Sequence, residues 1–194
     1  MKAIKSLGIF VLALSLTTSV FAGSQKVDAA KSSVKWLGKK VTGEHFGTIA
    51  VKEGNLEVAN GKVTGGKVVI NMQSLAVEDI KDAEMNGKLV GHLKSDDFFG
   101  VANFPTSELV VTKVESNGNS HTFSGNLTIK GVTNPASFTA TSAKDGKSTV
   151  YKGVLTIDRS KYNVRYGSNS FFDNLGDKAI YDEFTLDFSL VVTE

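Results

Sequence analysis

The sequence has no cysteine, and this absence excludes disulfide bonds, thiol catalysis and cysteine-ligated zinc. A chain of 194 residues without such cross-links must be stabilised by the burial of apolar side chains alone. No internal repeat or low-complexity segment divides it. The composition therefore predicts a single domain with one hydrophobic core.

Arginine is almost absent as well, since only Arg159 and Arg165 occur among the 22 basic residues. Proteins that read phosphates and bases usually gather arginine and lysine on one face, so the composition argues against nucleic-acid binding. Lys2 and Lys5 belong to the leader described next, and its removal leaves 20 basic and 20 acidic residues. The mature chain is then expected to be neutral rather than basic.

Long apolar runs are missing except for residues 7–16, which follow Lys2 and Lys5. This run is shorter than the ~20 residues that cross a bilayer, and a small-residue site at Ala22 follows it. The pattern predicts a signal peptide over 1–22, cleaved near Ala22, and a mature domain over 23–194. We expect a periplasmic or secreted protein. It should have no stable membrane anchor, because no later segment could span a bilayer and no cysteine follows the cleavage site.

Motifs for catalysis and metal binding are also missing. No G-x-S-x-G string marks a serine nucleophile, although a catalytic triad can be hidden from sequence. The three histidines, His45, His92 and His121, stand far apart, without the paired spacing of a zinc site. We therefore expect no catalytic residue, no metal and no cofactor, and a binding role rather than an enzymatic one.

Alternation of apolar and polar residues is what the chain does contain. From Ser33 onward apolar residues recur mainly at every second position, and Gly, Asn and Asp bound the segments. This period is typical of antiparallel strands with one buried and one solvated face. Eight segments qualify as strands: 33–40, 48–58, 63–72, 107–115, 120–130, 134–144, 148–158 and 182–193.

The joints between these segments predict how the strands are connected. Short joints such as 117–119 have the composition of hairpin turns, so consecutive strands should be antiparallel neighbours. Residues 78–94 place apolar side chains at roughly helical spacing and predict one amphipathic helix, weakened by Gly87 and Gly91. Residues 160–181 show no clear period and predict a loop. Eight antiparallel strands in one small domain favour a sandwich or a closed barrel, and an eight-stranded barrel has room for side chains or one slender ligand.

Several motifs connect the chain to a known family. They are 33–36 (SVKW), 61–66 (GKVTGG), 69–72 (VINM), 92–99 (HLKSDDFF), 104–105 (FP), 125–133 (GNLTIKGVT) and 157–159 (IDR). In this order they resemble the YceI-like family, the bacterial periplasmic polyisoprenoid-binding proteins. The resemblance implies an all-β fold, an eight-stranded antiparallel lipocalin-like barrel with one short helical insertion between strands 3 and 4. Two positions depart from the family's pattern, Asn71 where aspartate is frequent and Phe46 where a small polar residue is common, and they argue against an identical ligand.

The ligand class also follows from the resemblance, which implies a long-chain apolar lipid such as a polyisoprenoid, bound in the barrel for transport or storage. An apolar tunnel gives affinity for such a tail without specific polar contacts, because the tail is costly to expose to water. The candidate head-group contacts are His92, Arg159 and Arg165. The candidate wall residues are apolar and lie on inward faces or near the 92–105 stretch: Trp36, Phe98, Phe99, Phe104, Phe123, Leu127, Phe138, Leu155, Phe184, Leu186 and Phe188.

The stretch 92–105 mixes aromatic and charged residues in an otherwise alternating chain. We expect Ser95 to cap a short helical turn and Pro105 to set the entry into the next strand. Phe98 and Phe99 are expected to plug one end of the barrel, or to line the mouth through which a lipid enters. The two roles are compatible, because a pocket wall is also core.

Other roles remain open at this point. One is an enzyme acting on an isoprenoid-type lipid, with Asp96 and Asp97 beside the three head-group candidates. Another is a ligand-free structural or interaction module with a filled interior. Arg159 has two possible roles, a structural ion pair next to Asp158 or contact with an anionic head group. A homodimer is compatible with the resemblance, although no strand shows an exposed apolar stripe that requires one.

Overall fold

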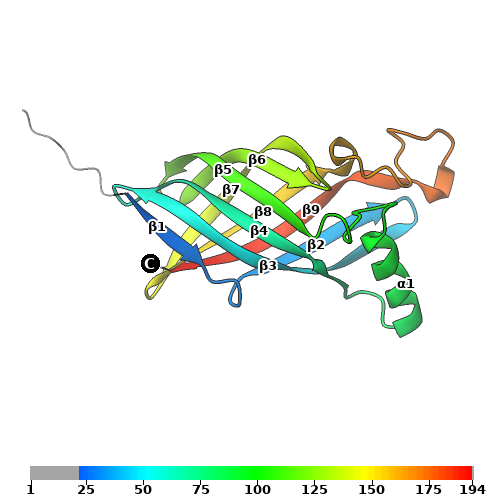
Figure 1. Ribbon diagram of the computed structural model, residues 1–194, viewed down its shortest axis with the longest axis horizontal. Coiled ribbons are helices and arrows are strands. Elements are labelled where there is room, and N and C mark those ends of the chain that lie inside the picture. The colour runs from blue at the N-terminus through cyan, green and yellow to red at the C-terminus, as the bar shows by residue number, and fades with distance from the viewer. Residues whose placement is uncertain (1–21, 194) are drawn as a thin grey trace, which may run out of the picture.

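The computed structural model describes residues 22–193, which form one antiparallel sheet closed into a barrel (Figure 1). All but the last residue of the predicted signal peptide lie outside the described residues. One α-helix, α1 (Ala83–Lys94), and two short 3₁₀ turns, η1 (Arg159–Tyr162) and η2 (Gly176–Lys178), interrupt the strands. The strands are β1 (Ala22–Val27), β2 (Ser33–Lys40), β3 (Gly43–Ala59), β4 (Lys62–Val77), β5 (Thr106–Asn117), β6 (Ser120–Ile129), β7 (Val132–Asp145), β8 (Ser148–Asp158) and β9 (Ile180–Thr193).

Nine strands make an eight-stranded barrel because β1 and β2 share one position in it. Both pair with β3 on one side and with β9 on the other, β1 at one end of the barrel and β2 at the other. Residues 28–32 leave the sheet between them. Every other strand pairs with its neighbours along the chain, so the predicted antiparallel barrel with one helical insertion is confirmed.

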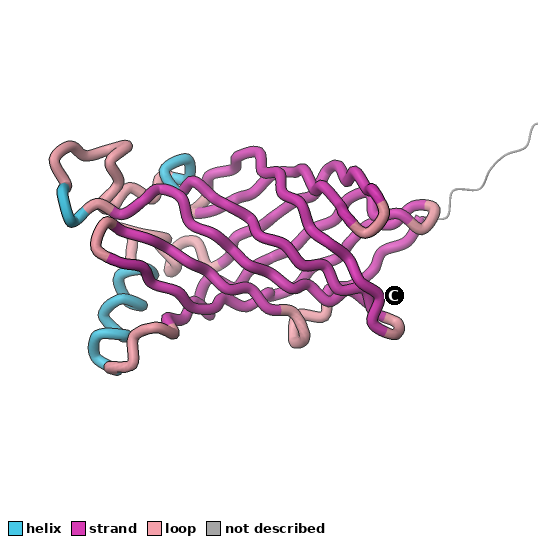
Figure 2. The backbone as a smooth tube through the Cα atoms, turned by 180° about the vertical axis from the view of Figure 1, so that it is seen from behind, coloured by secondary structure: helices cyan, strands magenta, loops and turns pink. Residues whose placement is uncertain are grey.

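The two ends of the barrel differ in how they are closed. At one end the connections are tight turns at 60–61, 118–119 and 146–147, and both ends of the described chain lie there (Figure 1). At the other end lie the β2–β3 turn, the segment with α1, the β6–β7 turn and the long 159–179 segment (Figure 2). We call the first the closed end and the second the mouth.

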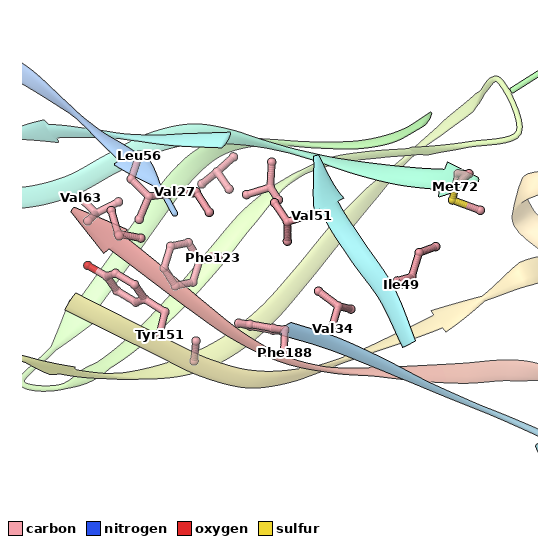
Figure 3. Packing of buried hydrophobic residues seen from close by; sticks show 14 of the residues in the cluster. Val27, Val34, Ile49, Val51, Leu56, Val63, Met72, Phe123, Tyr151 and Phe188 are labelled. Carbon is pink, nitrogen blue, oxygen red and sulfur yellow. The ribbon is translucent and has the colours of Figure 1, made fainter. Parts of the chain in front are cut away.

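The interior of the closed half is packed solid. Leu56, Val63, Val111 and Phe123 are buried there with Tyr151, and none of these five side chains is more than 8% exposed. Figure 3 shows Phe123 and Tyr151 beside Leu56 and Val63, while Ile49 and Met72 lie further along the barrel toward the mouth. This half supplies the hydrophobic core that the composition predicted.

Helix α1 confirms the predicted helix but is packed lightly. It begins after Asp82, whose side chain accepts a hydrogen bond from the Met85 amide at 2.8 Å. It ends at Ser95, whose hydroxyl and amide both donate to the carbonyl of His92. Ser95 therefore terminates this helix, and its carbonyl oxygen accepts from the amides of Phe98 and Gly100, so it also begins the predicted short turn that follows. Its hydroxyl points back to His92 and does not cap that turn. No residue of α1 is fully buried.

One ladder of the barrel is incomplete near the mouth. Strand β7 pairs with β8 only from Ala140 to Asp145, and residues 132–139 pair with β6 alone. Pro135, which has no amide hydrogen to donate, lies in this stretch. The gap is filled by the buried side chains of Tyr162 and Val164, which follow β8 and pack beside apolar residues of β7. We call this gap the β7–β8 seam.

Sequence reasoning missed β1 and shortened most other strands. Residues 22–27 lack clear alternation and adjoin the expected cleavage site, so only their pairing with β3 and β9 reveals a strand. The longest strands, β3 and β4, pass through register shifts, for example between Thr48 and Ala50, that disturb the two-residue period. Pro105 lies directly before β5, as predicted, and its carbonyl accepts from the Met72 amide. Within the described part of the chain, no helix is long and apolar enough to cross a membrane.

Candidate binding cavity

An apolar cavity of about 220 Å³ occupies the mouth half of the barrel. Exposed or half-exposed residues such as Lys39, Lys40 and Tyr181 belong to its lining, so the cavity reaches the surface at the mouth. On β9 the lining runs from Ile180 to Leu190. Ten residue steps at ~3.4 Å along a strand tilted by about 40° give a depth of about 25 Å. The cavity is therefore long and narrow.

Nine of the eleven predicted wall residues line this cavity. Seven of them lie on strands, which contribute alternate side chains to the interior, and this is why period-two reasoning found them. Phe98 and Phe99 lie in the turn after α1. The nine are Trp36, Phe98, Phe99, Leu127, Phe138, Leu155, Phe184, Leu186 and Phe188.

The other two wall candidates lie elsewhere. Phe123 is buried in the closed half, stacked on Phe138 with ring centroids 5.4 Å apart. Phe104 packs outside the cavity, against Gly131 of the β6–β7 turn. The structure thus corrects the interpretation of both residues, because alternation gives the face of a strand but not the depth along it.

A pair of aromatic rings forms the floor of the cavity. Phe138 and Phe188 both belong to the lining and meet edge to face, with centroids 5.5 Å apart. Beneath them Phe123 contacts Phe138 and Tyr151. The mouth half of the barrel is therefore open and the closed half is filled, with a layer of aromatic rings between them.

Trp36 fixes the wall near β3 and β4. Its indole Nε1 donates to the carbonyl oxygen of Ala76 at 2.9 Å, so the polar atom of this large side chain is satisfied while the ring lines the cavity. Gly47 lies across from it, and a Cβ there would come within 1.9 Å of the same Ala76 oxygen. The close approach of β3 and β4 at this point requires glycine.

Arg159 is buried, and four of its five N–H donors bond carbonyl oxygens. The guanidinium donates to the carbonyl oxygens of Val164, Tyr166, Ile180 and Tyr181 at 2.9 to 3.1 Å. Arg159 forms its ion pair with Asp182, where Nη2 and the carboxylate Oδ1 are 3.4 Å apart, and not with its sequence neighbour Asp158 as predicted. Burial lowers the pKa of Arg159, and the charges of these two carboxylates oppose that effect. Arg159 lines the cavity, but its hydrogen bonds tie the 160–181 segment to the barrel.

His92 offers a polar atom that nothing in the described chain satisfies. Its Nε2 is buried and has no hydrogen-bond partner. The ring is held between Phe98, with centroids 5.7 Å apart, and Tyr166, with centroids 4.4 Å apart. Because His92 belongs to the cavity lining, the apolar wall contains an unsatisfied nitrogen near the mouth.

Arg165, the third head-group candidate, is not in this cavity. Its guanidinium stacks on Phe171 at 4.9 Å and donates to the side chain of Asn163. It lines a separate hollow of about 680 Å³ on the outside of the mouth, together with Asp96 and Asp97. The residues named for an enzymatic site are thus divided between two cavities, with Arg165 and the two acids in the outer hollow and His92 and Arg159 in the apolar cavity.

A second histidine fastens the chain at the mouth. The Nδ1 of His45 lies 2.7 Å from the carboxylate of Asp79, which also accepts from the amide of Phe46. Partial burial opposes ionisation of Asp79, but these hydrogen bonds prevail and keep the pKa of its carboxyl below the ordinary value. The pair joins β3 to the segment before α1. Within residues 22–193, no group of three His, Asp or Glu side chains is arranged to hold a metal ion.

Sequence reasoning also missed wall residues on α1. Leu89 and Leu93 line the cavity from the helix, four residues apart and therefore on one helical face. That spacing was visible, but sequence alone did not show that this face turns toward the opening. The helix thus completes the wall at the mouth.

Comparisons with known proteins agree with this architecture. The family described as "YceI-like domain" matches residues 25–192. A protein of Shewanella denitrificans named UPF0312 protein is 31% identical over 141 residues, which cover 69% of this chain and 70% of the relative.

Two solved structures are similar in fold. BcnA of Burkholderia cenocepacia is 27% identical, with a TM-score of 0.66, and the match covers 86% of this chain and 99% of that one. A polyisoprenoid binding domain of Saccharophagus degradans, implicated in plant cell wall breakdown, has a TM-score of 0.61 at 16% identity. That match covers 87% of this chain and 97% of the Saccharophagus chain, and at this identity it shows the fold alone.

Proposed function

Because the chain belongs to the YceI-like family, we propose that it binds a long-chain apolar lipid, a polyisoprenoid, in the mouth half of the barrel. It would carry or store this lipid in the periplasm or outside the cell, after cleavage of the predicted signal peptide near Ala22. The lipid is bound without chemical change. The polyisoprenoid-binding domain of Saccharophagus degradans has a similar fold and supports this ligand class.

The observation that carries the proposal is the cavity itself. It is narrow, about 220 Å³ in volume, open at the mouth and closed by the rings of Phe138 and Phe188. An apolar chain drawn into it leaves water at about 25 cal/mol per Å² of buried surface. Aliphatic and aromatic walls stabilise any slender apolar tail in this way, because no specific polar contact is needed. A bulky fused-ring lipid, in contrast, would not fit a slender tunnel.

We further propose that His92 contacts the head group. Arg159 has four of its five N–H donors bonded to carbonyl oxygens, and Arg165 lies outside the cavity. His92 lines the cavity near the mouth with an unsatisfied Nε2, which suits a ligand hydroxyl, phosphate or carbonyl oxygen. The tail would then lie toward the floor and the polar end toward α1.

Native mass spectrometry of the protein purified from its own periplasm tests the main proposal. We expect a bound mass that increases in steps of one isoprene unit across a distribution of chain lengths. An empty barrel, or only a short polar molecule, would contradict a polyisoprenoid ligand. Failure to recover the protein from the periplasmic or secreted fraction would contradict the proposed location.

The substitution His92→Leu tests the head-group contact, because leucine keeps the apolar packing and removes Nε2. Affinity for a polyprenol should fall about fivefold, as expected for one lost hydrogen bond of ~1 kcal/mol. The matched probe is the hydrocarbon of the same chain length without the hydroxyl, whose affinity should not fall. Equal losses for both probes would show that His92 acts only through packing. Quenching or shift of the fluorescence of Trp36, the single tryptophan, measures both affinities.

A further inference from the structure

Exposed apolar side chains gather at the mouth of the barrel. Among the described residues, eight large apolar side chains are at least 39% exposed, and all but Val154 lie at this end. We call the other seven the apolar rim: Val41, Phe46, Met85, Tyr166, Phe171, Phe172 and Tyr181. Scattered exposed apolar residues are ordinary, but their concentration around one opening points to an interaction surface.

The apolar rim is built from separate segments that are joined around the opening. The amide of Val41, at the β2–β3 turn, donates a hydrogen bond of 3.1 Å to the carbonyl oxygen of Ala179, in the 159–179 segment. Tyr166 of that segment packs on His92 of α1. Tyr181 belongs both to the rim and to the cavity lining. The exposed apolar surface is therefore continuous with the apolar wall of the cavity.

We propose that the apolar rim docks on the surface of a lipid bilayer, with the mouth of the cavity facing the membrane. The inference rests on the proposed function for its reason: an apolar chain that is insoluble in water resides in a membrane and would otherwise cross water to reach the cavity. The rim residues belong to the β2–β3 turn, the mouth ends of β3 and β9, helix α1 and the 159–179 segment, so they surround one opening, which suits insertion into the head-group region of a bilayer.

The charges beside the rim indicate what kind of bilayer it fits. Lys39 pairs with Glu44 at 3.6 Å, and Arg165 and Lys178 line the outer hollow of the mouth together with Asp96 and Asp97. Positive and negative side chains are mixed, so no strong field attracts anionic lipid. Docking should therefore depend on apolar insertion, and neutral phosphatidylcholine should suffice at raised salt concentration.

Flotation with phosphatidylcholine vesicles tests this docking. Three substitutions each place a charge on a different segment of the rim: Val41→Asp, Met85→Asp and Phe172→Asp. We expect each to lower the partition coefficient about tenfold, because an apolar side chain that inserts is replaced by a charged one. Val154→Asp is the matched control, because Val154 is 53% exposed on β8, away from the mouth. It should bind vesicles as the parent does.

The outcomes separate this inference from the proposed function. The docking proposal is overturned if the parent protein does not bind vesicles, or if Val154→Asp lowers vesicle binding as much as the rim variants do. It is also overturned if the protein forms a dimer through the rim in sedimentation and does not bind vesicles. Native mass spectrometry on the same samples reports the bound lipid. A protein that contains lipid but does not bind vesicles would contradict docking and support lipid binding. A protein that contains no lipid but binds vesicles through the rim would support docking and contradict lipid binding. Melting temperatures of the variants show that they fold.

Discussion

Phe188 and Phe123 face the same interior at different depths, and one substitution should act differently at the two positions. Phe188→Trp adds bulk to the floor of an open cavity, so long-chain lipid binding should weaken while the stability changes little. Phe123→Trp adds bulk where the core is filled and should cost ~1 to 3 kcal/mol. Chemical unfolding and lipid retention on both variants check this. A loss of stability at Phe188 as large as that at Phe123 would indicate that the cavity is closed in solution.

Arg159 should be a structural residue before it is a ligand contact. Arg159→Lys keeps the charge but cannot reach four carbonyl oxygens and Asp182 at once, so buried acceptors lose their donors. We expect a loss of about 3 kcal/mol in the free energy of unfolding. Arg165→Lys, at the exposed arginine, is the matched control and should change stability by less than ~0.5 kcal/mol. Unchanged stability with lost lipid binding in Arg159→Lys would assign Arg159 to the head group instead.

At single positions, sequence reasoning identified chemistry better than location. Trp36 and Phe188 were placed on the cavity wall because apolar alternation marks the inward face of a strand. Phe123 has the same pattern and lies below the floor, because depth depends on the shear of the barrel, which no local pattern reports. Arg159 was paired with its sequence neighbour Asp158, but its carbonyl partners are brought to it by the folding of the 160–181 segment.

Helix α1 carries two glycines that the structure does not require. An added Cβ at Gly87 or Gly91 meets nothing within 4 Å, and the helix has no buried residue. Gly87→Ala and Gly91→Ala should each stabilise the helix by about 0.5 to 1 kcal/mol. Hydrogen exchange over residues 83–94 should slow, and lipid exchange should slow with it, if loose packing of α1 lets the mouth open. Gly47→Ala is the opposing control and should destabilise, since its Cβ would collide with the Ala76 oxygen. Faster lipid exchange in the α1 variants would contradict a role of the helix at the mouth.

The elements themselves were largely predictable. All eight predicted strands and the helix exist, because turn composition and two-residue alternation are local signals that the barrel preserves. The break between β1 and β2 was not predictable, since it depends on two strands sharing one place between β3 and β9. The β7–β8 seam is a similar case. Pro135 indicates a strand that is unpaired on one side, because proline cannot donate to a ladder. That Tyr162 fills the seam between β7 and β8 depends on tertiary packing, which the sequence does not show.

For the whole molecule, the depth of the cavity should set a limit on chain length. Affinity should rise with each added carbon of the chain until the tail reaches Phe138 and Phe188, about 20 Å from the mouth by strand rise and tilt along β9 from Ile180 to Phe188. Longer chains should protrude and gain nothing further. A series of polyprenols of increasing length, titrated by Trp36 fluorescence, gives the plateau, and Phe188→Trp should move it to shorter chains. Affinity that keeps rising with length, without a plateau, would be inconsistent with a closed floor.

The barrel closes where the first strands, β1 and β2, pair with the last strand, β9, and this pairing affects how the chain folds. Val191 donates to the hydroxyl of Ser32, 159 residues earlier, and Thr193 donates to the carbonyl of Lys26, 167 residues earlier. These contacts cannot form during synthesis until the final strand has emerged, and contacts of such separation make folding slow, on the order of milliseconds to seconds. Until then β2 and β8 present open edges and the apolar wall faces solvent, so the incomplete sheet is the state most exposed to aggregation. Thr193 pairs with Lys26, four residues along β1 from Ala22, so a circular permutation that joins these two ends through a short linker would shorten this separation and should speed folding.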